Sequence, residues 1–298
     1  MSAAPEVAVA FVIRDKFSCA LASLKRLYAF AQTPFRLYFV DGRYPRPVRA
    51  ELDAFLASKD NLVRLDARRF LYPNEALNLA LEHATEPFTL VLQNDILIGR
   101  GAVERLLATA RANDADVVAP ALLDLEQGTP SLHHDEDQDV AFHERDGKIH
   151  ADRAGIGTTG RGARRSDFFE MHCLLARTAT LRSLAPLPPL SVHEHVDVCL
   201  SLWRAGRTAY VEEDARVLIA GSPPLPLRDF ELPYYRFRWD PARGRQSDRY
   251  VRERWPIADL FEPSGFIARQ LQATRPEAVL RGYAAFAEDA WPEDFAAA

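Results

Sequence analysis

The feature that most constrains the fold is a regular alternation of short apolar runs with segments of helical periodicity. The predicted strands cover residues 7–13, 35–40, 61–65, 88–92 and 116–120, and the predicted helices cover residues 19–31, 45–58, 74–84 and 101–113. The apolar runs are typical of strands that are buried on both faces. Strands that alternate with helices require crossover connections, which produce a mostly parallel sheet with helices on both faces. The sequence therefore predicts a three-layer α/β fold.

The pattern is less regular after residue 120. Asp146-Gly147 lies between two β-compatible runs and predicts the tight turn of a hairpin. Further strands are predicted over 168–175, 209–211 and 216–219, with a helix over 194–205 that Gly206 closes. Prolines cluster from residue 221, an aromatic and arginine-rich stretch covers 234–255, and the tail from 258 has a helical pattern.

Charge and cysteine content exclude several classes of protein. The net charge of -5 gives no reason to expect a nucleic-acid partner or an anionic membrane surface. No apolar run approaches the roughly 18 residues of a membrane span, and no basic residue precedes the apolar run near the N-terminus, so we expect neither a transmembrane segment nor a signal peptide. Cys19, Cys173 and Cys199 are odd in number and widely spaced. We expect them to be free, in a reducing cytoplasm.

Polar side chains follow two of the predicted strands directly. Asp41 ends the second strand, and Asn94-Asp95 follow the fourth. Ligands of open α/β sheets bind beyond the carboxyl ends of the strands. Both positions are therefore candidate ligand-binding residues, although aspartate and asparagine also form ordinary turns after strands.

Four segments together resemble the inverting glycosyltransferases of GT-A fold that form family 2. The first two are the buried first strand and Val40-Asp41-Gly42. The third is the run NLALEHA at 78–84 with FTLVLQNDI at 88–96, and the fourth is HEHVDVCLSLWRAGRTAYVEEDARVLI at 193–219. The resemblance covers roughly residues 7–222. It implies a Rossmann-like α/β/α sandwich and a hexosyltransferase that moves a hexose or deoxyhexose from a nucleotide-sugar donor, UDP- or dTDP-linked, to a hydroxyl acceptor.

The resemblance also implies a division of the chain. Residues 1–225 would form the GT-A domain, with a nucleotide-sugar-binding half over 1–120 and an acceptor-binding half over 121–225. Residues 226–298 would form a C-terminal extension that is rich in aromatic residues and arginine and is helical. The extension is interpreted as a lid over the diphosphate, as a segment packed on the domain or as a contact with a partner subunit. The sequence leaves a homo-oligomer open.

Gln93-Asn94-Asp95 is similar to the DxD motif of this family, whose last aspartate binds the metal. By that match Asp95 holds a divalent cation, Mg²⁺ or Mn²⁺, which prefers oxygen ligands. Gln93 replaces the first carboxylate and is expected to contact the donor ribose. Many relatives have a histidine ligand after the last strand, where this chain has Ile219-Ala220. Metal dependence therefore stays open.

Two further residues match donor-side positions of the family. Asp41 stands where an aspartate accepts a hydrogen bond from the N3–H of a pyrimidine base. Its alternative role is an Asp-Gly turn. Asn78 matches an asparagine of the helix before the DxD strand, and either contacts the donor or supports neighbouring loops.

The acceptor side is assigned from His193–Asp197, the run HEHVD. An inverting transfer needs one general base, and His195 stands where relatives have the acidic residue that serves as that base. Glu194 is the competing candidate. Because neighbouring residues of a helix point about 100° apart, we expect one of the two to face the cleft. Asp197 lies on the same helix and is placed on the acceptor side.

Two other groups of residues are candidate acceptor or metal ligands. Glu170 and His172 alternate on the predicted strand 168–175 and are expected to face the acceptor. The run His133-His134-Asp135-Glu136-Asp137 is interpreted as a solvated loop, because adjacent residues do not converge on one cation.

Two other functions are alternatives to sugar transfer. The substitutions at Gln93, His195 and Ile219 leave open a degenerate GT-A domain that binds a nucleotide or a partner protein without turnover. A sugar-nucleotide pyrophosphorylase would need a glycine-rich basic loop after the first strand, and the run IRDKFS at 13–18 is not one.

Overall fold

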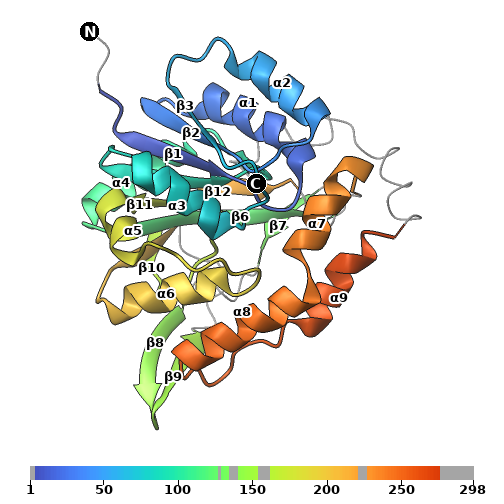
Figure 1. The fold of residues 1–298 in the computed structure, drawn as a ribbon. Helices are drawn as coiled ribbons and strands as arrows, with labels where there is room; N and C mark the ends of the chain where they lie inside the picture. The colour runs from blue at the N-terminus through green and yellow to red at the C-terminus, as the bar shows by residue number, and fades with distance from the viewer. Residues whose placement is uncertain (1–3, 127–128, 134–139, 154–161, 221–226, 276–298) are drawn as a thin grey trace.

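The computed structural model describes residues 4–126, 129–133, 140–153, 162–220 and 227–275 (Figure 1). The strands are β1 (Val7–Val12), β2 (Phe35–Asp41), β3 (Leu62–Asp66), β4 (Phe88–Gln93), β5 (Ile96–Ile98), β6 (Val117–Glu126), β7 (Thr129–Leu132), β8 (Val140–Arg145), β9 (Lys148–Arg153), β10 (Ala163–Arg165), β11 (Cys173–Arg177) and β12 (Ala209–Ile219). The helices are α1 (Ala20–Phe30), α2 (Arg46–Leu56), α3 (Pro73–His83), α4 (Ala102–Ala112), α5 (Thr178–Leu184), α6 (Glu194–Arg204), α7 (Leu232–Arg238), α8 (Pro241–Arg254) and α9 (Ser264–Gln272).

One mixed sheet forms the centre of the molecule, with the strand order β10-β12-β6-β11-β4-β1-β2-β3. Strands β3, β2, β1 and β4 are parallel, so their carboxyl ends meet at one edge. Strand β11 is antiparallel to β4, and the Gln93 amide donates to the carbonyl of His172 at 3.0 Å. The residues that precede β11 therefore lie at the same edge as the ends of β1 and β4.

The alternation of residues along β1 builds both halves of the core. Val9 and Phe11 face one side, where they share a buried cluster with side chains of α1, α2 and α4. Ala8 and Ala10 face the other side, with side chains of α3, α5 and α6. Successive residues of a strand point to opposite faces of its sheet. The fully apolar run therefore produces three layers, as predicted.

The elements predicted before residue 120 are all present, with ends shifted by a few residues. The predicted hairpin is confirmed as β8–β9, where Asp146 and Gly147 both have positive φ, 53° and 71°. The prediction for 168–175 was wrong over its first half, because the strand begins at Cys173. The strands predicted over 209–211 and 216–219 form the single strand β12, whose register shifts between Glu212 and Arg216. Elements β5, β7, β10 and α5 were not predicted.

The helices α7, α8 and α9 pack against the sheet domain (orange in Figure 1). Glu231, directly before α7, is fully buried and accepts hydrogen bonds from the amide and hydroxyl of Ser18 at 2.9 and 2.8 Å. The Tyr234 hydroxyl donates to the carbonyl of Leu71 at 3.0 Å. These contacts fasten α7 and the residue before it to the segment after β1 and to the loop between β3 and α3.

The three cysteines are buried and free, as predicted. Within the described ranges, no helix has the length and apolar character needed to cross a bilayer.

Candidate active site

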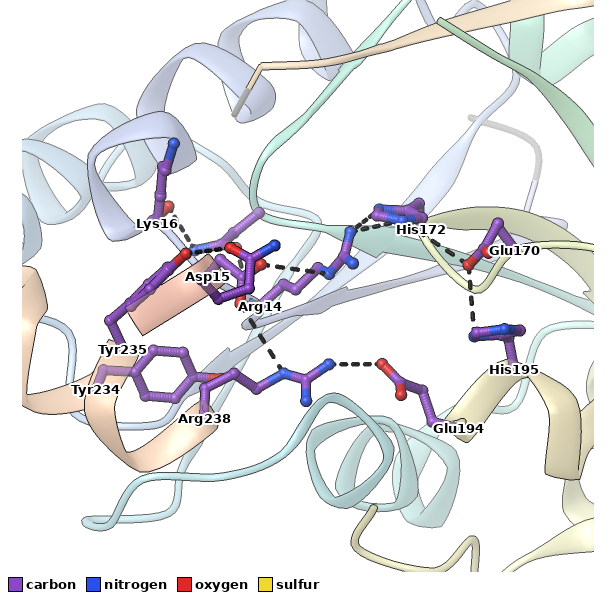
Figure 2. A network of polar contacts seen from close by, with 12 residues as sticks. Arg14, Asp15, Lys16, Glu170, His172, Glu194, His195, Tyr234, Tyr235 and Arg238 are labelled. Carbon is purple, nitrogen blue, oxygen red and sulfur yellow. Dashed lines mark hydrogen bonds and ion pairs between the residues drawn. The ribbon is translucent and has the colours of Figure 1, made fainter. Parts of the chain in front are cut away.

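A cavity of about 600 Å³ lies at the edge of the sheet where β1 and β4 end. Its walls come from the loop after β1, from Asp95, from the loop before β11, from the N-terminus of α6, from α7 and from residues 257–270. Figure 2 shows the polar network on part of this wall. The cavity therefore joins residues that lie far apart in the sequence.

The loop after β1 brings Arg14, Asp15 and Lys16 to the cavity. The side chain of Asn94 holds this loop in place: its Oδ1 accepts from the Arg14 amide at 3.0 Å, and its Nδ2 donates to the Lys16 carbonyl at 3.1 Å. Asn94 is fully buried and is absent from the cavity wall in the described part of the chain. It acts here as a support for the loop.

Asp95 follows Asn94 and lines the cavity, although it is only 2% exposed. Its Oδ1 accepts no hydrogen bond from the residues that the structure describes. Burial raises the pKa of Asp95 to about 6, and Arg14 and Lys16 oppose that rise while Asp15 adds to it. The fold thus keeps a carboxylate in a position that disfavours its charge, and a nearby cation would relieve this.

The cavity suits a divalent cation that is shared with a phosphorylated ligand. Mg²⁺ is commonly held by one or two carboxylates together with substrate phosphates, and the open Oδ1 of Asp95 supplies one such oxygen. Among the described residues there is no cluster of three or more acidic, histidine or cysteine side chains arranged to hold a metal. His133 lines the cavity, with Nδ1 at 2.6 Å from Asp124, while 134–137 of the acidic run lie outside the described residues.

Glu194 begins α6 and is 6% exposed. Its carboxylate accepts a hydrogen bond from Nη2 of Arg238 at 2.7 Å, and the side chain of Arg238 is 1% exposed. Burial acts to raise the pKa of Glu194, but the positive charges of Arg238, His195 and Arg14 together outweigh it and the pKa is lowered. Arg238 also lies 3.9 Å from Asp15. Glu194 is therefore held ionised by a buried guanidinium and is a weak proton acceptor.

His195 lies next to Glu194 and is more accessible, at 23% side-chain exposure. Its Nδ1 is 3.5 Å from Oε2 of Glu170, which in turn lies 3.9 Å from Nε2 of His172 (Figure 2). Arg14 donates from Nη1 to Nε2 of His172 at 2.6 Å. A polar chain therefore connects the loop after β1 with His195 through the loop before β11.

Both Glu194 and His195 line the cavity. The expectation that only one of them faces it was wrong. The reason is that the cavity passes over the end of α6 instead of along one of its sides, so the 100° between neighbouring residues does not separate them.

Asp41 is buried and is absent from the described cavity wall. Its Oδ1 accepts from the amides of Arg43 and Tyr44, both at 3.0 Å, and its Oδ2 is 3.1 Å from Nη1 of Arg49. Within the structure the carboxylate organises the turn after β2.

Asn78 and Gln93 also lie outside the cavity wall formed by the described residues. The amide group of Asn78 donates to the carbonyl of Leu187 and accepts from its N–H, both at 2.9 Å. This pair of bonds fixes α3 to the segment after α5. Gln93 is 2% exposed, and its Oε1 accepts no hydrogen bond from the described part of the chain.

Asp197 accepts hydrogen bonds from Nε1 of Trp255 at 2.8 Å and from Arg254 at 3.0 Å. It belongs to the packing between α6 and the end of α8 and does not appear in the described cavity wall. We expect Asp197→Ala to lower the free energy of unfolding by about 2 kcal/mol, because the buried indole N–H would lose its acceptor. Urea unfolding measures this, with Asp53→Ala as the control at an exposed ion pair. Unchanged stability together with lost turnover would instead place Asp197 in the site.

Arg14 and Arg238 are among the cavity residues that were not predicted. Arg14 follows β1 by two residues, so the strand-end rule that selected Asp41 and Asp95 could also have selected it. Arg238 is one of several arginines in an aromatic stretch, and no local pattern distinguishes it.

Residues 17–170, just over half of the chain, match the model of the family described as Glycosyl transferase family 2. No curated protein sequence matches. Among solved structures, GalNAc-T7 with UDP, GalNAc and Mn²⁺ aligns with a TM-score of 0.59 and 12% identity over 89% of this chain and 54% of that one. The chain therefore spans about half the length of GalNAc-T7.

Two smaller proteins align over more of their length. The mannosyltransferase PcManGT from Pyrobaculum calidifontis, in complex with GDP-Man and Mn²⁺, gives a TM-score of 0.56 and 15% identity over 96% of this chain and 77% of that one. TarS 1–349 of S. aureus, in complex with UDP, gives a TM-score of 0.54 and 16% identity over 95% of this chain and 73% of that one. At such identities the likeness concerns the fold alone.

Proposed function

The chain belongs to glycosyl transferase family 2 and has the GT-A fold, and from that premise we propose that it transfers a hexose or deoxyhexose from a UDP- or dTDP-sugar to an acceptor hydroxyl with inversion. The observation that carries the proposal is the shared cavity. It contains the buried carboxylate of Asp95, whose Oδ1 has no hydrogen-bond partner among the described residues, and the accessible imidazole of His195. Donor turnover, followed as the release of nucleoside diphosphate, tests the proposal.

Three charged residues support donor binding at the end of β1 and β4. Asp95 would hold the divalent cation, which when bound neutralises the leaving diphosphate as a Lewis acid. The structures of GalNAc-T7 and PcManGT contain Mn²⁺. Arg14 and Lys16 line the same wall and offer positive charge to the phosphate oxygens. Lys16 is only 3% exposed, and burial lowers its pKa. A diphosphate would therefore restore a favourable environment for its charged form.

Inversion requires a single displacement at the anomeric carbon, with one base to take the proton of the acceptor hydroxyl. His195 fits this role better than Glu194, because Glu194 is bound to Arg238 and its pKa is lowered. Glu170 lies beside Nδ1 of His195 and favours the tautomer that carries its proton there. Nε2 is then free to accept the hydroxyl proton while the nucleoside diphosphate leaves.

A nucleotide-binding module without turnover is the second candidate. It is favoured by the substitutions at Gln93 and Ile219, which replace a carboxylate and a histidine ligand of the family. Among the described residues no three acidic, histidine or cysteine side chains are arranged to hold a metal. Such a module would bind nucleoside diphosphate but would release none from a donor.

We expect UDP or dTDP to raise the melting temperature more than GDP or ADP, by about 5 °C at a hundredfold excess over Kd. The reason is the carboxylate of Asp41 at the end of β2, which would accept the pyrimidine N3–H. Thermal shift with Mg²⁺ measures it. Asp41→Asn is the matched control: its Oδ1 still accepts from the amides of the turn, but its charge is gone, so the preference should shrink. A larger shift with a purine nucleotide would contradict base recognition by Asp41.

A further inference from the structure

The part of the cavity around the N-terminus of α6 has mainly apolar walls. Phe142 comes from β8, Phe168 from the loop before β11, Leu260 and Phe261 from the segment after α8, and Phe266 from α9. These segments are far apart in the sequence, and the fold brings their side chains to one cavity. An enclosed apolar surface of this kind is typical of a ligand site.

Two groups of aromatic rings lie at the start of α6. Phe168 packs edge-on to the ring of His195 at 5.4 Å between centroids, and Phe142 lies 6.5 Å from Phe168. Phe261 lies 6.5 Å from the ring of His193, two residues before His195, and 6.4 Å from Phe266. Because both groups line the same cavity as His195, a molecule whose hydroxyl reaches His195 meets an aromatic wall.

Phe261 is 57% exposed, and among the described residues only Tyr250, at 37%, is another large hydrophobic side chain with such exposure. Unlike Tyr250, Phe261 lines the cavity. An aromatic side chain left in water at the rim of a cavity gains free energy when a ligand covers it. Its position indicates an apolar ligand surface at the mouth.

The polar groups of this wall are largely engaged with the protein itself. The pairs are Ser191 with Ser247, His193 with Asp248, and Tyr235, whose hydroxyl donates to Gln270. Asp259 and Arg269 are exposed residues of the wall. A saccharide needs a partner for each hydroxyl that it buries, since an unmade hydrogen bond is costly. Further polar atoms of the described wall have no hydrogen-bond partner, on Arg14, Asp15, Arg238 and Trp239, but these atoms are buried beneath the surface that a hydroxyl would meet.

We propose that the acceptor is an apolar alcohol, a hydroxyl carried on an aromatic or alkyl body, and not a saccharide. This rests on the proposed function, because it takes His195 as the base. The acceptor O–H proton passes to Nε2 of His195, the oxygen forms its bond to the anomeric carbon of the donor, and the bond to the diphosphate oxygen breaks. The products are an apolar glycoside and a nucleoside diphosphate.

The test compares acceptors on the purified full chain with Mg²⁺ and a donor panel of UDP-glucose, UDP-galactose, UDP-N-acetylglucosamine and dTDP-glucose. The acceptors are 2-naphthol, 1-octanol and the methyl glycosides of glucose, galactose and mannose. We expect an apolar acceptor to raise the rate of nucleoside diphosphate release at least about tenfold over the acceptor-free rate. Mass spectrometry should detect the glycoside product. Equal or faster turnover with a methyl glycoside would overturn the apolar acceptor and leave sugar transfer intact.

Calorimetry separates the two proposals. Binding of 2-naphthol to the UDP-bound protein is expected, and it needs no turnover. Binding without release from any donor would refute sugar transfer and keep the apolar site. Absence of 2-naphthol and 1-octanol binding would refute the apolar site.

Variants of the two exposed aromatic residues test which ring contacts the acceptor. Phe261→Ser should raise the KM for 2-naphthol about fivefold to tenfold, the size expected when part of one ring contact is lost. Tyr250→Ser is the matched control, because it removes the other exposed aromatic ring from a position outside the described cavity wall, and its KM should not change. Equal KM values for the two variants would refute the role of Phe261.

Discussion

Asp95→Asn should reduce sugar transfer by at least about 10³-fold and at the same time stabilise the ligand-free protein at neutral pH. The loss follows because asparagine carries no charge for the cation that neutralises the leaving diphosphate, an electrostatic contribution that commonly amounts to several kcal/mol. Nucleoside diphosphate binding should also lose its enhancement by Mg²⁺ or Mn²⁺. Donor turnover and nucleotide titrations with and without metal measure both effects.

The gain in stability follows from the raised pKa of Asp95. The folded protein holds this carboxyl at a pKa of about 6, against an ordinary value of 3.8, mainly because it is buried. The unfolded chain therefore releases the proton first as the pH rises, and stability is lost between about pH 4 and 6. Asparagine avoids that loss, so the variant should gain about 1–3 kcal/mol at pH 7 and almost nothing at pH 4. Urea unfolding at both pH values measures it.

The control for this prediction is Asp53→Asn, since Asp53 is half-exposed and forms surface ion pairs. We expect it to show neither effect. Normal turnover in a folded Asp95→Asn protein would remove Asp95 from the site. An equal loss of stability at both pH values would contradict the account of its burial.

His195→Ala should lower turnover by at least about 10²-fold, the usual effect of losing a positioned base, while nucleoside diphosphate binding stays within a few-fold. Because a general base acts only in its unprotonated form, the acidic limb of the pH–rate profile should disappear in the variant. Steady-state rates across pH, with nucleotide affinity measured in parallel, test the prediction.

Glu194→Gln and Glu170→Gln are the matched comparisons. If Glu194 were the base, its variant would be the more damaging one and the acidic limb would lie at lower pH. If Glu170 orients the imidazole, Glu170→Gln should lower turnover but should cost less than His195→Ala. Near-normal rates in the variants of His195 and Glu194 would mean that the base lies elsewhere.

The fold could be predicted from the sequence because each strand and helix has a local pattern of apolar residues that identifies it. The run of β1, for example, is buried on both faces and needs no distant partner to be recognised. The sequence also selected Asp95 and His195, which follow a strand and open a helix, and the structure brings both to one cavity. The environment of Asp197 could not be predicted in this way, because its partners Arg254 and Trp255 approach from about 57 residues away along the chain.

The same limit explains the error over 168–175. The alternation of polar and apolar residues suggested a strand, but β4 ends at Gln93, opposite His172. Within the described ranges no strand pairs with Glu170, and this residue lies in a loop. The length of β4, and not the sequence around Glu170, decides where β11 begins.

The buried guanidinium of Arg238 makes α7 inseparable from the N-terminus of α6. It supplies the positive charge next to Glu194 and Asp15, yet it lies beyond both the family match and the boundary predicted at residue 225. A nascent chain of only the first 225 residues would leave these two carboxylates without it, so this part of the cavity would stay incomplete until α7 has emerged from the ribosome. For the same reason, a chimaera that exchanges the acceptor-binding half with a relative would have to carry α7 along with α6.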